Sequence, residues 1–293
     1  MLRYAGRRIL SAIPTLLIVY TLVFLIAHVT PGSPWDVGTN RPVDPQVKAA
    51  LDARFHLDRP IYVQYLEYLG GALRGDLGPS YRASSQSVDD IVRQFLPVSI
   101  ELGSAAMALA ILFGLPLGAL AALSGRAWID GAVRVFGTLG ISLPTYVVTS
   151  VLIVLLGVEL GLVPTFGWQG LFSRSAVVPV ISLALAPMAA IIRYFRSSLL
   201  EVRNLDYVRT ARAKGVAPAA ILVRHMARNA LVPVVTVIGV YASYVMVGSF
   251  FVESIAGVPG FGRYFVLSVA ARDYPVIIGT ALVYAVFIIG INF

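Results

Sequence analysis

Cysteine is absent from this chain, and charged residues are scarce. With no cysteine among 293 residues, the chain has no disulfide scaffold, thiolate metal site, thiol nucleophile or iron–sulfur cluster. Charged residues make up 13% of the sequence, hydrophobic residues 58%, and the mean hydropathy is +0.81, whereas soluble domains contain about 25% charged residues. These figures exclude an ordinary soluble domain and indicate a protein made mainly of membrane-spanning segments.

The sequence patterns of common catalytic sites are also missing. A P-loop requires G-x-x-x-x-G-K-[ST], but the only two lysines, Lys48 and Lys214, are followed by Ala49 and Gly215. The three histidines form no H-E-x-x-H metal motif, and no G-x-S-x-G nucleophile elbow occurs. We therefore predict a non-catalytic chain with no catalytic residues, no metal site and no cofactor of its own.

Six stretches lack Asp, Glu, Lys and Arg and are 18 to 24 residues long. A helix needs about 20 residues to cross a bilayer, so each stretch is predicted to be one spanning helix of an all-α polytopic membrane protein. Internal prolines, including Pro144, do not change this prediction because membrane helices tolerate them. The first stretch is too long for a signal peptide and is predicted to be retained. The stretches are 9–29, 102–125, 135–158, 175–192, 229–252 and 274–293.

The positions of the basic residues predict the orientation of these helices. Thirteen Lys and Arg residues flank the predicted spans on the side of the N-terminus, and three flank them on the other side. Because basic loops stay in the cytoplasm, the N-terminus is predicted to be cytoplasmic. The net charge of +8 is therefore read as a signal for topology, not for nucleic acid. The sixth span has no basic flank before Phe293, so we expect the natural chain to continue beyond it.

Residues 30–97 are predicted to form a small helical extracytoplasmic domain between the first two spans. Asp44-Pro45 is typical of a helix start, Asp58 and Pro60 begin a second helix, and Ser87 to Asp90 form a capping box that leads through Pro97 toward the second span. The predicted organisation is residues 1–29, residues 30–97 and a transmembrane core of residues 98–293. The sequence leaves open whether the outer domain is a structural cap or contacts a partner or substrate.

Eight of the basic residues lie between the fourth and fifth spans, from Arg193 to Arg228, and six of these fall in a loop of about residues 201–228. The pattern predicts a short helix over 205–214, a left-handed turn at Gly215, and a second helix that starts at Ala217-Pro218. Small residues here would let another protein approach the backbone, and the cations could pair with acidic groups. Orientation in the membrane and contact with anionic lipid are the alternatives. The candidate docking residues are Asp206, Arg209, Thr210, Ala211, Arg212, Ala213, Lys214 and Gly215.

This loop resembles the EAA-type loop of permease subunits of binding-protein-dependent ABC importers, in the form of the dipeptide and oligopeptide group. The general EAA pattern begins with Glu, where this chain has Arg209, and places its proline nearer the glycine. The similarity extends over nearly the whole chain and is strongest to the B permease subunit of oligopeptide importers. The matching segments are RTARAKG (209–215), RHMARNALVP (224–233), RRILSAIPTL (7–16), TPGSPWD (30–36), RFHLDRPIYVQYLEYL (54–69), GDLGPSY (75–81), VESIAGVPGFGRYF (252–265) and RDYP (272–275).

The resemblance implies a type I ABC importer permease fold and a subunit that forms half of a translocation pore for oligopeptides or dipeptides. It implies a homologous C-type permease, two cytoplasmic ATPase subunits that carry ATP and Mg, and an extracytoplasmic binding protein that delivers the peptide. The location implied is the prokaryotic plasma (inner) membrane, and residues 209–215 become the segment that couples to the ATPase. Nickel chelates, sugars or another small solute are alternative substrates for the same type of importer.

Two further residues are candidates for the pore or its gate. Glu101 is a carboxylate beside a predicted span, where charge is expensive and often functional, although stabilisation at a helix N-terminus after Pro97 would also explain it. Phe261 lies in the Gly- and Pro-rich run of residues 254–262, which we expect to be non-helical and either to dip toward the pore mouth or to connect two spans. An ion-coupled secondary transporter is the alternative of another class, but the uncharged spans offer it no ionisable residues.

Overall fold

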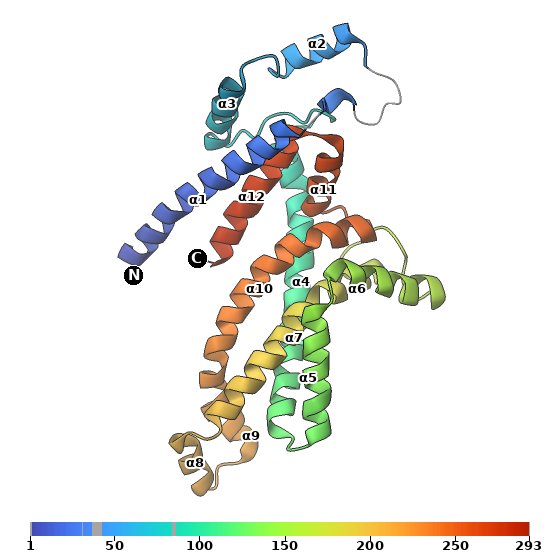
Figure 1. Cartoon of the computed structure of the whole chain (residues 1–293). Helices are drawn as coiled ribbons and strands as arrows, with labels where there is room; N and C mark the ends of the chain where they lie inside the picture. Colours follow the sequence, from blue (N-terminus) through green and yellow to red (C-terminus); the bar gives the residue numbers. More distant parts are fainter. Residues whose placement is uncertain (1, 31, 37–42, 84–85, 293) are drawn as a thin grey trace. The chain divides into compact units, whose positions relative to one another are not determined.

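The computed structural model describes residues 2–30, 32–36, 43–83 and 86–292, and most of these residues are helical (Figure 1). No strand longer than an isolated bridge between Pro79 and Ser87 occurs among them. The elements are α1 (Leu2–Val29), η1 (Pro34–Asp36), α2 (Pro45–Arg54), α3 (Ile61–Leu73), α4 (Val88–Leu123), α5 (Ala127–Ser142), α6 (Thr145–Leu152), the π-helix η2 (Ile153–Glu159), η3 (Arg174–Ala176), α7 (Val177–Val202), α8 (Asp206–Ala213), α9 (Pro218–Ala220), the π-helix η4 (Ile221–Met226), α10 (Ala227–Ala256), α11 (Phe261–Ala271) and α12 (Tyr274–Asn292).

Five unbroken helices are long and apolar enough to cross a membrane, which confirms a polytopic helical protein. These helices coincide with five of the six predicted spans, although Phe293, where the sixth uncharged stretch ends, lies outside the described residues. Two further pairs of helices, each interrupted by a short break, could add up to two spans. The unbroken candidates are Gly6–Val29, Val88–Leu123, Arg174–Val202, Pro218–Met246 and Tyr274–Asn292.

The third predicted span is broken, so the prediction of one continuous helix over residues 135–158 is wrong. Helix α5 ends at Ser142, α6 begins at Thr145, and the two segments meet at an angle of 105°. Pro144 has no N–H to donate to the helix, and its ring pushes the preceding residue toward an extended backbone. Leu143 is extended (φ −82°, ψ 124°), so here the proline ends the helix.

The Gly- and Pro-rich run is shorter than predicted, and a helix follows it that sequence analysis missed. Only residues 257–260 are non-helical, because α10 continues to Ala256 and α11 begins at Phe261. Gly257 ends α10 with φ +71°, and the Phe166 ring lies about where a side chain at this position would begin, 2.6 Å from an ideal Cβ. Arg263 and Arg272 limit the length of the uncharged run around α11, so the helix escaped a search for long uncharged stretches.

The chain divides into two compact units. The first consists of Met1–Ser99 with Pro259–Ile291, and the second consists mainly of Ile100–Val258. The first unit therefore combines α1, the helices before α4 and the C-terminal helices. Its core is the cluster of Tyr20, Phe24, Ala27, Tyr274 and Ile278, against which side chains of α3 pack.

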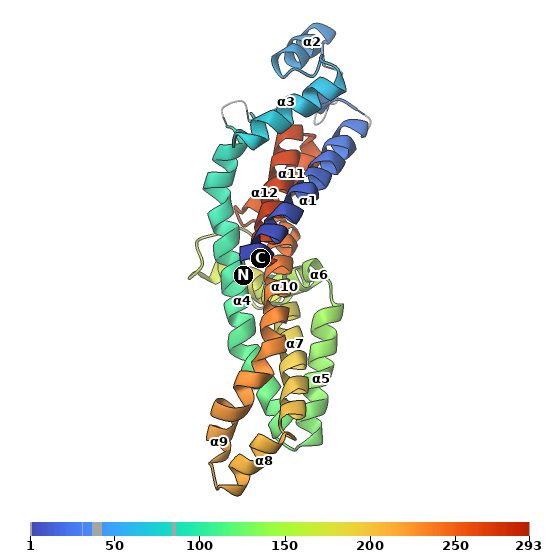
Figure 2. The ribbon, with the colours of Figure 1, turned by 90° about the vertical axis from the view of Figure 1, so that its left-hand side faces the viewer.

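Helix α7 is the central element of the second unit. It lies between α5 and α10 in both views (Figures 1 and 2), and 72% of its most apolar stretch is buried. Helix α4 approaches it through Gly114 and Gly118, a G-x-x-x-G spacing that brings membrane helices close together. A Cβ added to Gly118 would lie 3.0 Å from the carbonyl oxygen of Ile192, and one added to Gly140 of α5 would lie 2.8 Å from the Ala189 Cβ.

We predict that Gly118→Leu destabilises the second unit, because a side chain at this position meets the backbone of α7. Overpacking of this kind costs about 1–3 kcal/mol. Gly131→Leu is the matched control, since Gly131 is also on a helix but has open space where its Cβ would be. The thermal unfolding midpoint of the detergent-solubilised protein should fall for the first variant only, and equal midpoints for both variants would refute the packing role of Gly118.

Candidate functional site

The segment between α7 and α10 has the local structure that its sequence predicts. Helix α8 runs from Asp206 to Ala213, Lys214 is its C-cap, and Gly215 follows in the left-handed region with φ +74°. The N–H of Gly215 donates to the Arg212 carbonyl (2.9 Å) and that of Val216 to the Ala211 carbonyl (3.2 Å), the Schellman pattern of a helix end. Pro218 then occupies the first position of α9, which confirms the predicted helix–turn–helix.

One face of α8 packs on the protein and the other is open. Val208 and Ala211 are buried, and the Asn229 side-chain amide donates to the Tyr207 hydroxyl (2.7 Å), which ties α8 to the start of α10. Ala211 therefore does not present the small outer surface that its residue type led us to expect. Val208 and Ala211 are three residues apart and therefore share one face of the helix, which is the face that packs inward.

The remaining candidate docking residues all face outward. Arg209 lies 3.8 Å from Asp206, but both side chains are mostly exposed, and exposed pairs contribute little to stability (about 0–1 kcal/mol). Thr210 donates its hydroxyl hydrogen to the Asp206 carbonyl of its own helix (2.9 Å). The cations thus remain open to a partner's acidic groups. The exposed members are Asp206, Arg209, Thr210, Arg212, Ala213, Lys214 and Gly215.

Basic segments gather at one end of the second unit. Both views place the turn between α4 and α5 at the same end as α8 and α9 (Figures 1 and 2). Arg126 precedes α5 and Arg134 lies on its second turn. Arg193 and Arg196 lie in the last part of α7, five cations lie between α7 and α10, and Arg228 is the second residue of α10. Their common location agrees with the sidedness that the charge distribution predicts.

Glu101 is not near a helix N-terminus. Helix α4 starts at Val88 and continues through Pro97 without interruption, so Glu101 lies more than three turns into it. The helix dipole acts within about one turn of a helix end, and the N-terminal explanation for this carboxylate is therefore wrong. Its side chain is exposed, and a role at the pore or gate stays a prediction.

Phe261 is the first residue of α11, and its side chain is fully buried. Its ring centroid lies 5.2 Å from that of Tyr284 on α12, and its backbone N–H donates to the Ser99 hydroxyl (2.9 Å). All three residues belong to the first unit. These contacts anchor the start of α11 in the interior, and contact of Phe261 with substrate stays a prediction.

Three of the matching sequence segments converge on Asp273, a junction that sequence analysis did not foresee. The Asp273 carboxylate is buried and accepts hydrogen bonds from the Ser80 hydroxyl (2.5 Å), the Tyr81 N–H (3.0 Å) and the Arg82 N–H (3.3 Å). Arg82 in turn donates to the carbonyls of Ala271 (3.3 Å) and Pro34 (2.7 Å). The segments 30–36, 75–81 and 272–275 thus meet. The sequence feature that linked them beforehand was their shared resemblance to one family.

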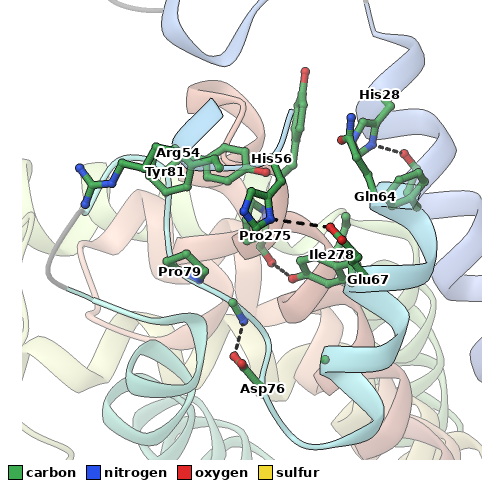
Figure 3. A pocket seen from close by; sticks show the side chains of 16 residues that line it. His28, Arg54, His56, Gln64, Glu67, Asp76, Pro79, Tyr81, Pro275 and Ile278 are labelled. Atoms are coloured by element: carbon green, nitrogen blue, oxygen red, sulfur yellow. Dashed lines mark hydrogen bonds and ion pairs between the residues drawn. The ribbon is translucent and has the colours of Figure 1, made fainter. Parts of the chain in front are cut away.

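A cavity of about 320 Å³ opens beside this junction in the first unit (Figure 3). Five Phe and Tyr residues contribute to its walls, and several polar groups on it are already engaged. Glu67 forms an ion pair with Arg59 and lies 3.7 Å from the His56 Nδ1, and the Asp76 carboxylate accepts a hydrogen bond from the Gly78 N–H. Burial raises the pKa of the Tyr68 and Tyr81 hydroxyls above their usual range, so both are neutral at physiological pH. The aromatic lining consists of Phe24, Phe55, Tyr68, Tyr81 and Tyr274.

Among the described residues, no cluster of three or more His, Asp or Glu side chains is suited to hold a metal ion. The features that stand out are the exposed basic helix–turn between α7 and α10, the segment of residues 80–82 that is hydrogen-bonded to Asp273, and the broken third span. A multi-pass helical protein with such a loop belongs to the class of membrane-embedded transport subunits.

The comparison with known proteins defines the family. Residues 114–293 match the model of the binding-protein-dependent transport system inner membrane component, and residues 1–103 match the model of its N-terminal part. This chain belongs to that family of inner membrane components. It is 42% identical to the dipeptide transport system permease protein DppB of Bacillus subtilis over 99% of this chain and 92% of the relative. It is 38% identical to the oligopeptide transport system permease protein OppB of Haemophilus influenzae (96% and 92% covered).

We predict that Asp273→Asn loosens the segment between α1 and α4 in the first unit. The substitution places an amide group where the carboxylate accepts three hydrogen bonds, and loss of bonds to a buried charged group costs about 1.5–3 kcal/mol. Asp58→Asn is the control, because Asp58 is exposed. Limited proteolysis should cleave residues 30–97 faster in Asp273→Asn than in wild type or Asp58→Asn. Equal cleavage rates in all three proteins would show that Asp273 does not hold the segment.

Proposed function

We propose that this chain is the permease subunit of an ATP-driven peptide importer and forms half of its translocation pore. The observation that carries the proposal is the exposed, glycine-closed helix α8 between the spanning helices α7 and α10. A non-catalytic pore subunit needs such an element to receive energy from another chain. Relatives that are named dipeptide and oligopeptide permeases, at 36–42% identity, favour peptides as the substrate.

The proposed complex contains a homologous C-type permease, two cytoplasmic ATPase subunits and an extracytoplasmic binding protein. ATP and Mg would bind to the ATPase subunits, and residues 206–215 would enter a cleft on one of them. The N-terminus would be cytoplasmic, the membrane would be the plasma (inner) membrane of a prokaryote, and the outer segment of residues 30–97 would face the binding protein. The exposed cations Arg209, Arg212 and Lys214 suit an acidic cleft.

The packing of α8 supports a mechanical role. Its buried face rests on the protein, the Tyr207–Asn229 hydrogen bond links it to the base of α10, and only three residues separate it from the end of α7. A movement of α8 would therefore be passed to both spanning helices as a rigid-body rocking. Closure of two ATPase subunits on ATP would supply that movement.

Two alternatives are distinguished by one observation each. An importer of nickel chelates, sugars or another small solute would have the same permease architecture, and the ligand that co-purifies with the binding protein would identify it. An ion-coupled secondary transporter would take up solute without an ATPase. Uptake by this chain alone, with ATP hydrolysis blocked, would contradict the proposed function.

We predict that Gly215→Val uncouples ATP hydrolysis from uptake. A β-branched residue is strained at φ +74° and would distort the turn that closes α8. Gly125→Val is the matched control, because Gly125 has φ +66°, open space around it and a place in the turn before α5. In reconstituted complexes, Gly215→Val should reduce uptake per ATP hydrolysed about tenfold or more, while Gly125→Val leaves that ratio near wild type. Normal coupling in Gly215→Val would refute the role of the turn.

The absence of native cysteine permits a direct test of orientation. We predict that Lys48→Cys, in α2, is labelled in intact cells by a membrane-impermeant maleimide, whereas Lys214→Cys, next to the α8 turn, is labelled only after permeabilisation. Lys214 is exposed and Lys48 is half-buried, so the labelling of each variant in intact cells is compared with its own labelling after permeabilisation. The opposite pattern of labelling would invert the proposed topology.

A further inference from the structure

A groove of about 470 Å³ lies between α7 and α10 in the second unit. Helix α7 is buried along most of its length but becomes exposed at Arg193 and Tyr194, which form one wall. Pro233, Thr236 and Tyr241 of α10 belong to the other wall. The two helices run side by side in both views (Figures 1 and 2), and the volume falls within the range of about 300–1,000 Å³ that is typical of sites for small ligands.

Arg193 is a cation within a helix that is apolar enough to span the membrane. Its guanidinium carbon lies 5.3 Å from the centroid of the Tyr194 ring, and no ion pair of Arg193 is found among the described residues. Arg196, one turn further along α7, is different: its Nε and Nη2 both donate to the Asp130 carboxylate, the latter at 2.8 Å. Arg196 is therefore neutralised within the chain, whereas Arg193 lines the groove without an acidic partner among the described residues.

The opposite wall offers hydrogen-bonding groups beside an apolar floor. Two of the residues that line this wall, Thr236 and Tyr241, carry a hydroxyl group. The Tyr241 ring packs edge-on against that of Tyr244, with centroids 5.9 Å apart, and Val237 and Val240 add apolar surface. A cation with polar groups at one end and aliphatic side chains nearby suits a short chain that carries a carboxylate.

Arg193 directly follows the uncharged stretch of residues 175–192, so its exposed guanidinium lies beside apolar helix surface and is available to a partner charge. We propose that the groove binds the C-terminal carboxylate of the peptide during its passage, with Arg193 as the residue that recognises it. A guanidinium matches a carboxylate in charge and in planar two-bond geometry. The site thus distinguishes peptides with a free carboxylate from those in which it is blocked. This inference rests on the proposed function, because it requires that the chain conduct peptides.

The test compares Arg193→Gln and Arg193→Lys in the reconstituted complex with binding protein and ATP. One tripeptide is supplied as the free acid and as its C-terminal amide, and the ratio of variant to wild-type uptake is measured for each. We expect Arg193→Gln to lower kcat/KM about tenfold for the acid and less than twofold for the amide, with partial recovery in Arg193→Lys. Arg126→Gln removes an exposed arginine elsewhere in the unit and should change neither ratio.

A second measurement does not depend on the selectivity of the binding protein. A photoreactive phenylalanine analogue at Tyr241 should crosslink radiolabelled tripeptide acid during ATP turnover, and this crosslinking should weaken in the Arg193→Gln background. The same analogue at the exposed Trp128 of α5 should remain uncrosslinked.

The possible outcomes separate the inference from the proposed function. If Arg193→Gln lowers uptake of the acid and the amide equally, and a change in anionic lipid content restores that uptake, Arg193 binds a lipid headgroup instead. Loss of the partner permease from the Arg193→Gln complex would assign it to the interface between subunits. Unchanged uptake with no crosslink at Tyr241 would refute a substrate site of any kind here. If wild type imports neither peptide, the proposed function itself fails.

Discussion

The close approach of α4 and α5 to α7 is the contact on which the second unit depends. Gly118 and Gly140 leave no room for a side chain against the backbone of Ile192 or the methyl group of Ala189. In a membrane the hydrophobic effect does not drive helices together, so close van der Waals packing between small residues takes its place. Because α7 is held in this way and leads directly into α8, the segment beyond the membrane starts from a fixed base.

Asp130 in the second unit and Asp273 in the first each pair with specific groups of the chain. Asp130 on α5 neutralises Arg196, so the end of α7 carries one internally paired arginine and one, Arg193, that faces a groove. In the first unit, buried Asp273 joins segments that lie far apart in the sequence. The Asp130 carboxylate pairs with Arg196 and leaves Arg193 available to another molecule, whereas the Asp273 carboxylate satisfies one hydroxyl and two backbone N–H groups within the chain.

Sequence-based predictions of local structure were correct where the backbone preferences of single residues decide the conformation. The turn at Gly215 and the start at Pro218 depend only on backbone conformations that glycine and proline favour, and the structure has both. The same reasoning failed for Pro144, because a membrane helix continues through a proline only when its surroundings re-satisfy the freed carbonyl. Helix α4 passes through Pro97 and Pro116 without a break, and nothing in the residues themselves distinguishes these prolines from Pro144.

By itself the sequence determined that the protein is helical and polytopic, where most of its spans lie, and which segment is basic and closed by glycine. These properties follow from hydropathy, charge and local backbone preference, each of which acts over a few neighbouring residues. Only the tertiary structure decided that Ala211 packs inward, that Phe261 is buried, that Asp273 joins three segments and that Arg193 rather than Arg196 keeps an open charge. Each of those outcomes depends on which distant residue lies opposite, and no local pattern contains that information.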